Sequence, residues 1–485
     1  MTLRNFRITN HPLSFFTLLI AAKLITGPVP ANAQTESICP AQLPQAIDAI
    51  ANRPQFSRAR WGLSIQTLTS AQTLYSREAQ RYFIPASNTK LFTTAAALRQ
   101  LGAGYRIRTS IYGSEESLRL VGRGDPSLKD AQLKDLAQQL KRRGIRQVKQ
   151  LIIEDGYFQG QPLNPSWQWE DVYAYYGAPV NSLILNENAI ELTLSPQAIG
   201  QPLKPVWTDP LAALQWELEN QSITAANGQE NSVETNGILG KPILQIRGQL
   251  AVNSKPATLF ISVRDPGKYF LQHLRLAFAA EGITVAQAAV SPKIDTENQP
   301  EIAWVESPPL YQLIADTNQP SDNVYAEVLL RSLGVKRDRN SPNSAATGLT
   351  VIKETLTELG VDPTGYALVD GSGLSRQNLI SPEAIVQTLK AMGKLPQASI
   401  FRASLPVAGI SGTLKNRFKN TPAQGIVQAK TGTMSGVTAL SGYVDAPNYQ
   451  PIVFSIIVNQ SDQTTAQLRQ GVDDIVVLLT RLRRC

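Results

Sequence analysis

Histidine is almost absent from this sequence, whose 485 residues include only His11 and His273. His11 falls within an N-terminal segment that we expect to be removed, and His273 lies in a helix-like run with no nucleophile pattern nearby. A Ser-His-Asp enzyme would have to use this one histidine, and a histidine-based metal site is nearly excluded. We therefore expect a structural role for His273, no metal and no cofactor. If the protein is a hydrolase, its general base is expected to be another residue type.

Cysteine is equally scarce, with Cys39 and Cys485 close to the two ends of the chain. In an oxidising compartment this pair can form one disulfide that ties the termini together. Two unrelated free thiols are the alternative. Lipid modification of Cys39 is disfavoured because Ile38 replaces the small residue that such processing requires.

Long apolar runs are missing after residue 33, and no later segment approaches the ~18 residues needed to span a bilayer. The first 33 residues have the parts of an export signal: basic residues Arg4 and Arg7, an apolar core, and the small-x-small site Ala31-Asn32-Ala33. Lys23 interrupts the apolar region, which argues against a permanent membrane helix. We expect cleavage after Ala33 and export to the periplasm or the cell exterior, in association with the cell wall.

A strong excess of charge is also missing. Loss of residues 1–33 removes three basic residues and no acid, and lowers the formal net charge from +8 to +5. This modest excess is compatible with an anionic cell-wall or membrane surface. No basic stripe interleaved with aromatics is present, so we do not expect a nucleic-acid partner.

The pattern of strands and helices changes twice along the chain. A hairpin is predicted at residues 61–76, and a helix follows Pro85. From about 106 to 300, short strand candidates alternate with turns and a few helices, and residues 200–255 are rich in Gly, Asn, Pro and Gln. Helices return after residue 305, and the second of them is predicted to end at Gly334. This order indicates a first unit that is interrupted by a middle region of different character.

The C-terminal part predicts an antiparallel meander, with three strands between residues 425 and 458 separated by short turns. Residues 465–484 form a closing helix with an apolar stripe. The stripe is expected to pack on the sheet, and the alternative is a helix on a membrane surface, given the arginines at its end.

Residues 165–179 crowd five aromatics beside two acids, and no strict period organises them. The segment is therefore predicted to be a loop. Aromatics at loop positions often line binding grooves, and anchoring in the core is the rival interpretation. The spacing alone leaves both open.

Ser87 and Lys90 stand at helical spacing in the segment that follows Pro85, and Gly102 lies where that helix would stop. A lysine this close can take the proton of the serine if the lysine is itself neutral, and serine needs such a neighbour to act as a nucleophile. A Ser-x-x-Lys pair alone is weak, because a chain of this length contains on the order of one by chance.

Two further signals follow in order: Ser321-x-Asn323 and Lys430-Thr431-Gly432. Together the three place a nucleophile at a helix start, a hydroxyl and an amide in a loop, and a lysine on a strand. This set can carry out acyl transfer without histidine.

With these motifs the chain resembles the penicillin-binding proteins of the D-alanyl-D-alanine carboxypeptidase/endopeptidase group. The 234 residues that separate Ser87 from Ser321 point to that group, which carries a large insertion after the first motif. Three further stretches carry the resemblance: Gly122-x-Gly124-Asp125-Pro126, residues 370–376 and residues 405–414.

The resemblance implies an α/β (α+β) fold with a serine β-lactamase/transpeptidase-like domain, in which helices flank an antiparallel sheet. An inserted pair of smaller domains splits it. The expected division is listed here: signal peptide 1–33, catalytic domain 34–105 and 305–485, inserted domain 106–200 and 256–304, and nested small β domain 201–255.

By this resemblance, Ser87 would attack the carbonyl between two D-alanines and become acylated, with Lys90 as the base. Lys430, a second cation in the pocket, would lower the pKa of Lys90. Backbone N–H groups of Ser87 and Thr433 would form the oxyanion hole. The remaining roles are these: Ser321 would relay the proton to the leaving amine, Asn323 would hold the substrate's amide, and Lys430, Thr431 and Thr433, with Gly432 between them, would receive the terminal carboxylate.

The resemblance also suggests how the rest of the substrate is read. Asp171, Tyr176 and Arg376 match positions that contact the side chain of the third peptide residue. An Asp and an Arg facing each other suit a zwitterionic end such as that of diaminopimelate.

The implied function is a serine DD-peptidase that acts on the stem peptides of peptidoglycan, at D-Ala-D-Ala termini or at cross-links, and is inhibited by β-lactam antibiotics. A serine β-lactamase is one alternative, which the long insertion disfavours. A catalytically inactive wall-binding relative is the other, and the intact motifs argue against it.

Overall fold

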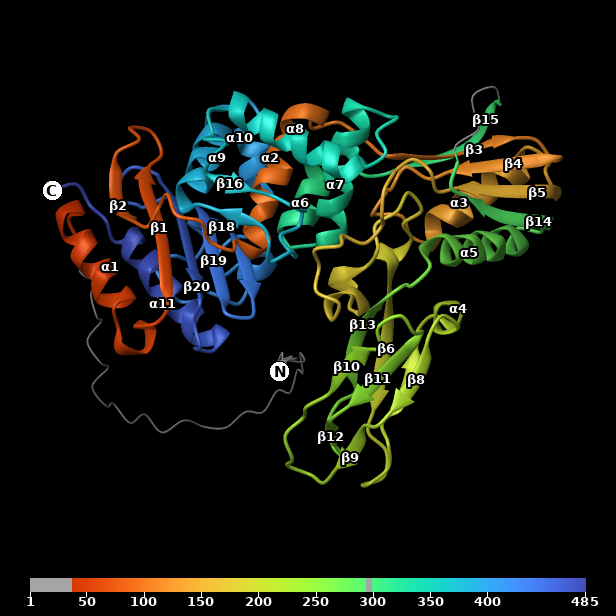
Figure 1. The fold of residues 1–485 in the computed structure, drawn as a ribbon, viewed down its shortest axis with the longest axis horizontal. Coiled ribbons are helices and arrows are strands. Elements are labelled where there is room, and N and C mark those ends of the chain that lie inside the picture. The colour runs from red at the N-terminus through yellow and green to blue at the C-terminus, as the bar shows by residue number, and fades with distance from the viewer. Residues whose placement is uncertain (1–36, 294–298) are drawn as a thin grey trace, which may run out of the picture.

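The computed structural model describes residues 37–293 and 299–485, so the predicted export segment lies outside the described residues. The molecule has three regions (Figure 1): a five-stranded sheet with a helical layer, a second five-stranded sheet, and a group of short strands. In the parts of the chain that the structure describes, no helix is long and apolar enough to cross a membrane.

The first sheet has the order β18-β19-β20-β1-β2 and is antiparallel throughout. It confirms both the predicted hairpin and the predicted meander. Every residue of β19 and β20 is buried, because helices cover both faces of the sheet. Its strands are β1 (Arg60–Thr67), β2 (Thr73–Arg77), β18 (Val427–Met434), β19 (Val437–Val444) and β20 (Ile452–Asn459).

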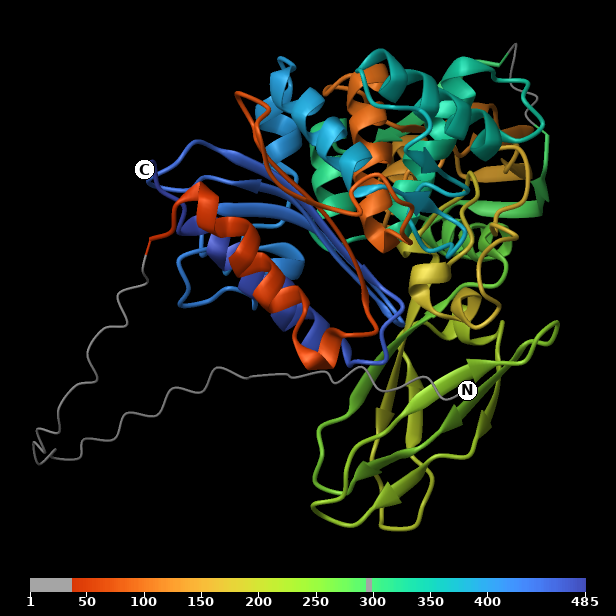
Figure 2. The same ribbon diagram turned by 60° about the vertical axis from the view of Figure 1, so that its left-hand side comes forward.

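One face of this sheet is covered by α1 (Leu43–Ala51) and α11 (Thr465–Thr480), which lie side by side in Figure 2. Val472 and Ile475, in the apolar stripe of α11, are fully buried in the core beneath the sheet. The packed arrangement predicted for this helix is therefore confirmed, although the helix ends at Thr480.

The chain ends meet next to these two helices. Cys39 and Cys485 form a disulfide with their Cα atoms 5.8 Å apart, which confirms the pairing that the sequence left open. Ile38 also forms a bridge with Leu482, so the two ends are joined by backbone as well as by sulfur.

The other face of the sheet carries a layer of helices whose core includes Phe92, Leu329 and Ile457. Gly334 was predicted to end the second helix after residue 305, and this is wrong because α7 continues to Arg337. A Cβ at Gly334 would lie 1.9 Å from the carbonyl oxygen of Ser344, so this glycine serves the close contact between α7 and α8. The layer contains α2 (Lys90–Leu101), α6 (Leu310–Asn318), α7 (Asn323–Arg337), α8 (Ser344–Glu358), α9 (Pro382–Lys394), α10 (Ala398–Ala403) and the short pair β16 (Tyr366–Ala367) and β17 (Leu379–Ile380).

The middle region builds a second sheet, in the order β14-β5-β4-β3-β15, with β4, β5 and β14 parallel. Its hydrophobic core is continuous with that of the short strands and is formed from residues between Ile111 and Val305. We propose that the insertion spans residues 106–304. Its elements are β3 (Arg108–Gly113), β4 (Ser117–Val121), β5 (Gln147–Glu154), β14 (Thr284–Ser291), β15 (Glu301–Glu306), α3 (Asp130–Arg142) and α5 (Pro266–Ala280).

Short strands form the region at the bottom of Figure 1, in three small sheets of order β13-β6-β7, β10-β11-β8 and β12-β9. Its elements are β6 (Ala189–Ser195), β7 (Lys204–Trp207), α4 (Pro210–Ala213), β8 (Glu217–Asn220), β9 (Ile223–Ala225), β10 (Glu234–Gly237), β11 (Ile243–Arg247), β12 (Gln249–Ala251) and β13 (Ala257–Ser262).

His273 joins this region to the second sheet. From α5, its Nδ1 lies 2.6 Å from Asp130 Oδ1 at the start of α3, and its Nε2 lies 2.9 Å from Asp209 Oδ2 at the start of α4. Burial alone would lower the pKa of His273, but the hydrogen bonds and charges of the two aspartates raise it to about 9. This arrangement supports the structural role expected for the residue.

The clamp formed by His273, Asp130 and Asp209 predicts a pH-dependent contribution to stability. Because the folded pKa lies above the unfolded value of about 6.5, the contribution is complete below pH 6.5 and is lost as the pH rises through 9. We expect His273→Gln to lower the melting temperature by a few degrees at pH 7 and by much less at pH 10. Melting curves of both proteins check this, and an equal difference at the two pH values would contradict it.

Candidate active site

Ser87 lies in a short 3-10 turn, η3 (Ala86–Thr89), that leads directly into α2. Ala86 has a φ of +47°, so the chain reverses sharply just before the serine. Two glycines allow other segments to approach this turn: a Cβ at Gly373 would lie 2.0 Å from the carbonyl oxygen of Ala86, and one at Gly432 would lie 2.6 Å from that of Pro85. The turn therefore presents Ser87 where the second and third motifs can reach it.

Lys90 is fully buried and gathers the first two motifs around its ammonium group. Its Nζ lies 3.0 Å from Ser87 Oγ, 2.6 Å from Asn323 Oδ1 and 2.7 Å from the carbonyl oxygen of Ser372. Asn323 and Ser372 offer uncharged acceptors, which can hold a neutral amine through its two N–H groups while its lone pair faces Ser87. The geometry therefore suits proton removal from the serine.

Burial lowers the pKa of Lys90 to about 8, although the carboxylates of Asp322, Asp370 and Glu327 act in the opposite direction. The resemblance attributed this lowering to Lys430. In the structure the main cause is the burial of Lys90 itself.

Lys430 and Ser321 form the other half of the site. Lys430 Nζ donates to Ser321 Oγ at 2.8 Å and to the carbonyl oxygen of Thr431 at 3.0 Å. Ser321 has a φ of +70°, an uncommon conformation for a residue other than glycine. Burial and the nearby charge of Lys90 lower the pKa of Lys430 well below its usual value.

Asn323 links this centre to the aromatic loop. Its Oδ1 accepts from Lys90, while its Nδ2 donates to the carbonyl oxygen of Tyr176 at 2.7 Å. One N–H of the amide is already used within the protein, which leaves the second for a ligand.

β18 is an edge strand of the first sheet, and residues 406–408 pair with the first part of its outer side, up to Ala429. Ala429 donates its N–H to the carbonyl oxygen of Pro406, away from β19. Because N–H groups alternate along a strand, those of Thr431 and Thr433 point to the same open edge. Ser87 lies in the first turn of its helical segment, where N–H groups lack partners within the helix. Of these three N–H groups, those of Ser87 and Thr433 are the two expected to form the oxyanion hole.

Thr413 forms a contact that none of the three motifs predicts. The hydroxyl of Thr431 donates to Thr413 Oγ1 at 2.8 Å, and the Thr413 N–H donates to the carbonyl oxygen of Gln319 at 3.0 Å. The residue therefore joins the strand of the third motif to the segment before the second. Its place within residues 405–414, which carried part of the family resemblance, was the available signal.

The aromatic loop, residues 165–179, both anchors in the core and exposes side chains at the surface. Trp167 is buried and donates its Nε1 to Asp370 at 3.0 Å, so it anchors the loop in the core. Tyr176 is 38% exposed, and its hydroxyl donates to Asp171 Oδ1 at 3.2 Å.

Burial raises the pKa of Asp171, and the charge of Arg376 acts weakly in the opposite direction. The Arg376 guanidinium itself donates to the carbonyl oxygen of Ser435 at 3.1 Å. The structure thus joins Tyr176 to Asp171 and leaves Arg376 without a hydrogen bond or ion pair to either.

A buried ion pair supports this centre from α7. Glu327 Oε1 accepts from the N–H groups of Gly371 and Ser372 at 2.8 and 3.0 Å, and Glu327 Oε2 pairs with Arg331 at 3.1 Å. Arg331 also donates to the carbonyl oxygen of Gln161 at 3.1 Å. The pair fixes the segment whose Ser372 carbonyl holds Lys90. Its only signal in the sequence was an acid and a base one turn apart in an apolar helix.

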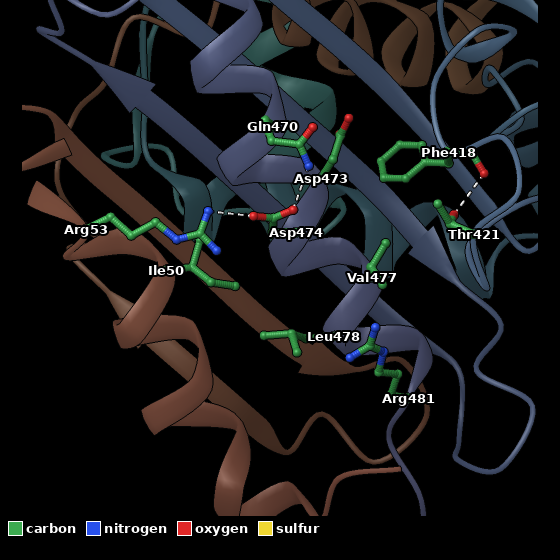
Figure 3. Close-up of a pocket in the computed structure, with 10 residues that line it drawn as sticks. All are labelled: Ile50, Arg53, Phe418, Thr421, Gln470, Asp473, Asp474, Val477, Leu478 and Arg481. Atoms are coloured by element: carbon green, nitrogen blue, oxygen red, sulfur yellow. Dashed lines mark hydrogen bonds and ion pairs between the residues drawn. The ribbon is translucent and has the colours of Figure 1, made fainter. Parts of the chain in front are cut away.

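A cavity of about 480 Å³ lies elsewhere, between α1 and α11 (Figure 3). Its walls include Ile50, Phe418 and Leu478, with Asp474 bound to Arg53 at its edge. None of the motif residues lines it. Across residues 37–293 and 299–485, no cluster of three or more His, Cys, Asp or Glu side chains could hold a metal ion.

Known proteins resemble this chain over most of its length. The D-Ala-D-Ala carboxypeptidase 3 (S13) family matches residues 43–482, a span that contains all three motifs. A D-alanyl-D-alanine carboxypeptidase from an Actinomadura species is 33% identical over 466 residues, which cover 91% of this chain and 86% of the relative. A penicillin-sensitive carboxypeptidase A from Dictyostelium discoideum is 29% identical over 466 residues, and 87% of each chain is covered.

Solved structures agree with this likeness. Penicillin binding protein 4 (dacB) from Haemophilus influenzae matches with a TM-score of 0.78 at 22% identity, over 90% of this chain and 99% of that one. The match confirms the predicted fold class, an α+β protein with a transpeptidase-like fold and additional sheets.

Proposed function

The chain belongs to the D-Ala-D-Ala carboxypeptidase 3 (S13) family, and we propose that this serine DD-peptidase of peptidoglycan works through an acyl-enzyme on Ser87. The observation that carries this assignment is the 3.0 Å contact between Lys90 Nζ and Ser87 Oγ, in a buried position where uncharged acceptors hold the lysine. Burial lowers the pKa of this amine, and its neutral form is the base that a serine nucleophile needs.

In the acylation step, Lys90 takes the proton of Ser87 while Ser87 Oγ attacks the carbonyl carbon of the penultimate D-alanine. The negative charge that develops on the carbonyl oxygen is stabilised by the N–H groups of Ser87 and Thr433, each worth about 10²–10³ in rate. The C–N bond then breaks, and the terminal D-alanine leaves as an amine.

The leaving amine needs a proton, which Ser321 relays within its hydrogen bond to Lys430. Asn323 holds the peptide amide with its second N–H, and Lys430, Thr431 and Thr433 receive the terminal carboxylate. Water then attacks the acyl-enzyme and gives one proton through Ser321 to Lys430, which replaces the proton that the leaving amine received. Lys90 returns its proton to Ser87 Oγ as the C–O bond breaks, and the shortened peptide leaves with a new carboxylate. Both lysines regain their starting protonation, and water is the only co-reactant.

The side chain of the third peptide residue is read by Asp171, Tyr176 and Arg376. The carboxylate of Asp171 and the guanidinium of Arg376 would bind the ammonium and carboxylate groups at the zwitterionic end of diaminopimelate. The hydrogen bond from Tyr176 to Asp171 and the effect of the Arg376 charge on Asp171 support this role.

Arg376→Ala is therefore expected to lower kcat/KM about tenfold or more for peptides that contain diaminopimelate. Plain D-Ala-D-Ala peptides, which lack the second charged end, should lose little. Steady-state kinetics on the matched peptide pair measure the difference, with Arg337→Ala on the exposed end of α7 as the control. Equal losses on both peptides would exclude side-chain reading by Arg376.

We also propose export to the periplasm or the cell exterior, in association with the cell wall, after cleavage of a signal peptide ending at Ala33. The disulfide between Cys39 and Cys485 supports an oxidising compartment. β-Lactams are proposed to acylate Ser87, and the complex of Haemophilus influenzae penicillin binding protein 4 with a β-lactam supports this.

Two assays on the purified protein test the proposal. A fluorescent penicillin should form a stable adduct, whereas rapid turnover would indicate a β-lactamase and no adduct a wall-binding protein. Linear and cross-linked muropeptides should then be digested in parallel. Release of D-alanine from linear peptides measures carboxypeptidase action, and loss of cross-linked dimers measures endopeptidase action.

A further inference from the structure

Arg469 connects α11 to the strand of the third motif. The helix lies on the opposite face of the sheet from α2, yet near its start Arg469 Nη2 donates to Thr433 Oγ1 at 3.3 Å. Thr433 is one of the residues proposed to receive the terminal carboxylate of the substrate. A guanidinium therefore lies directly behind a hydroxyl of the carboxylate site.

Few groups of the protein neutralise the positive charge of Arg469. Among the described residues it forms no ion pair within 4 Å, and its Nε is buried without a hydrogen-bond partner. Asp473 lies one turn along α11, but both of its carboxylate oxygens are bonded by Arg417. A partly buried guanidinium in such surroundings favours an anion nearby.

The hydrogen bond also orients the Thr433 hydroxyl. A hydroxyl has one proton to donate and two lone pairs that accept. Because Arg469 has only donors, it must occupy a lone pair of Thr433 Oγ1, which leaves the hydroxyl proton free to point elsewhere. The Thr433 N–H lies on the open edge of β18, so a carboxylate at that edge can accept from the hydroxyl.

We propose that Arg469 is a positioning residue for carboxylate recognition, which directs the Thr433 hydroxyl to the terminal carboxylate and adds positive charge behind it. This inference rests on the proposed function, since it assumes that Thr433 receives the carboxylate. Arg469 makes no direct contact with the reacting atoms; it acts through Thr433 and through its charge. Selection for substrates with a free carboxylate next to the scissile bond is the consequence.

The test compares a peptide that ends in D-Ala-D-Ala with the same peptide ending in a carboxamide. Arg469→Gln keeps a donor but loses the charge, and we expect it to lower kcat/KM about 10- to 100-fold on the carboxylate peptide. The carboxamide peptide should lose less than twofold. Arg469→Lys, which keeps the charge, should recover part of the loss on the carboxylate peptide only.

Arg481→Gln is the matched control, because it removes a guanidinium from the end of the same helix, on the cavity drawn in Figure 3. It should leave both rates unchanged. If Arg469→Gln does not fold, Arg469→Lys carries the test through its partial loss confined to the carboxylate peptide.

The outcomes separate the two proposals. Wild-type enzyme that cleaves the carboxylate peptide, with equal losses on both peptides in Arg469→Gln, would overturn the role of Arg469 and leave the proposed function standing. Wild-type enzyme that cleaves neither peptide and takes no penicillin label would overturn both.

Discussion

Replacing Ser87 with alanine is expected to lower hydrolysis of D-Ala-D-Ala peptides at least about 10⁴-fold and to abolish penicillin labelling. The reason is chemical: without Oγ no ester to the enzyme can form, and Lys90 loses the proton donor that lies 3.0 Å from its Nζ. Residual hydrolysis above the uncatalysed rate would come from the oxyanion hole and from substrate binding alone. Gel fluorescence after penicillin treatment and D-alanine release measure the two effects.

The fold should survive this change. Ser87 is only half-buried, and the positive φ that shapes the turn belongs to Ala86, which is untouched. Melting curves of the variant and the wild type should therefore agree within a few degrees. Ser57→Ala, at an exposed turn residue, provides a serine control that should label normally. A Ser87→Ala protein that is folded and still labelled would remove Ser87 from its role.

Much of the fold could be predicted because its signals are local. The meander of β18, β19 and β20 follows from apolar strands separated by short turns, and the stripe of α11 follows from its spacing. Gly334 shows where local reading fails. The sequence offers the same residue for a helix end and for a close helix contact, and only the packing of α8 decides between them.

The motif residues were predictable in a different way. Ser87 and Lys90 are close in sequence, so helical spacing alone places them together. Ser321 and Lys430 are distant from that pair, and only the order of the motifs and the family resemblance predicted that they would meet. The 2.8 Å contact between Lys430 and Ser321 is a tertiary fact that no periodicity encodes.

The supporting residues could not be predicted. Thr413, Glu327 and Arg469 each act through contacts between segments that are far apart in the chain. Each is a common residue type without a motif of its own. The cause of the lowered pKa of Lys90 could not be predicted either. We expected the charge of Lys430 to lower it, whereas burial of Lys90 is the main cause. How deeply a side chain is buried depends on the packed fold.

Replacing Lys90 with methionine is expected to slow acylation by penicillin about 10²- to 10⁴-fold, the usual contribution of a general base. Methionine keeps an unbranched apolar chain in the buried position but has no proton acceptor of useful strength. Stopped-flow measurement of the second-order acylation rate tests the prediction. Lys394→Met, on the exposed last turn of α9, should acylate at the wild-type rate.

The pH dependence gives this prediction its sharpest form. Lys90 must be neutral to accept a proton, and burial lowers its pKa to about 8, so wild-type acylation should rise with pH and level off above pH 8. Asp322, the middle residue of the second motif, has its pKa raised by desolvation to about 6 and would titrate separately. Lys90→Met should lose the rise of the acylation rate near pH 8. If that rise persists in Lys90→Met and disappears in Lys430→Met, the base is Lys430 instead.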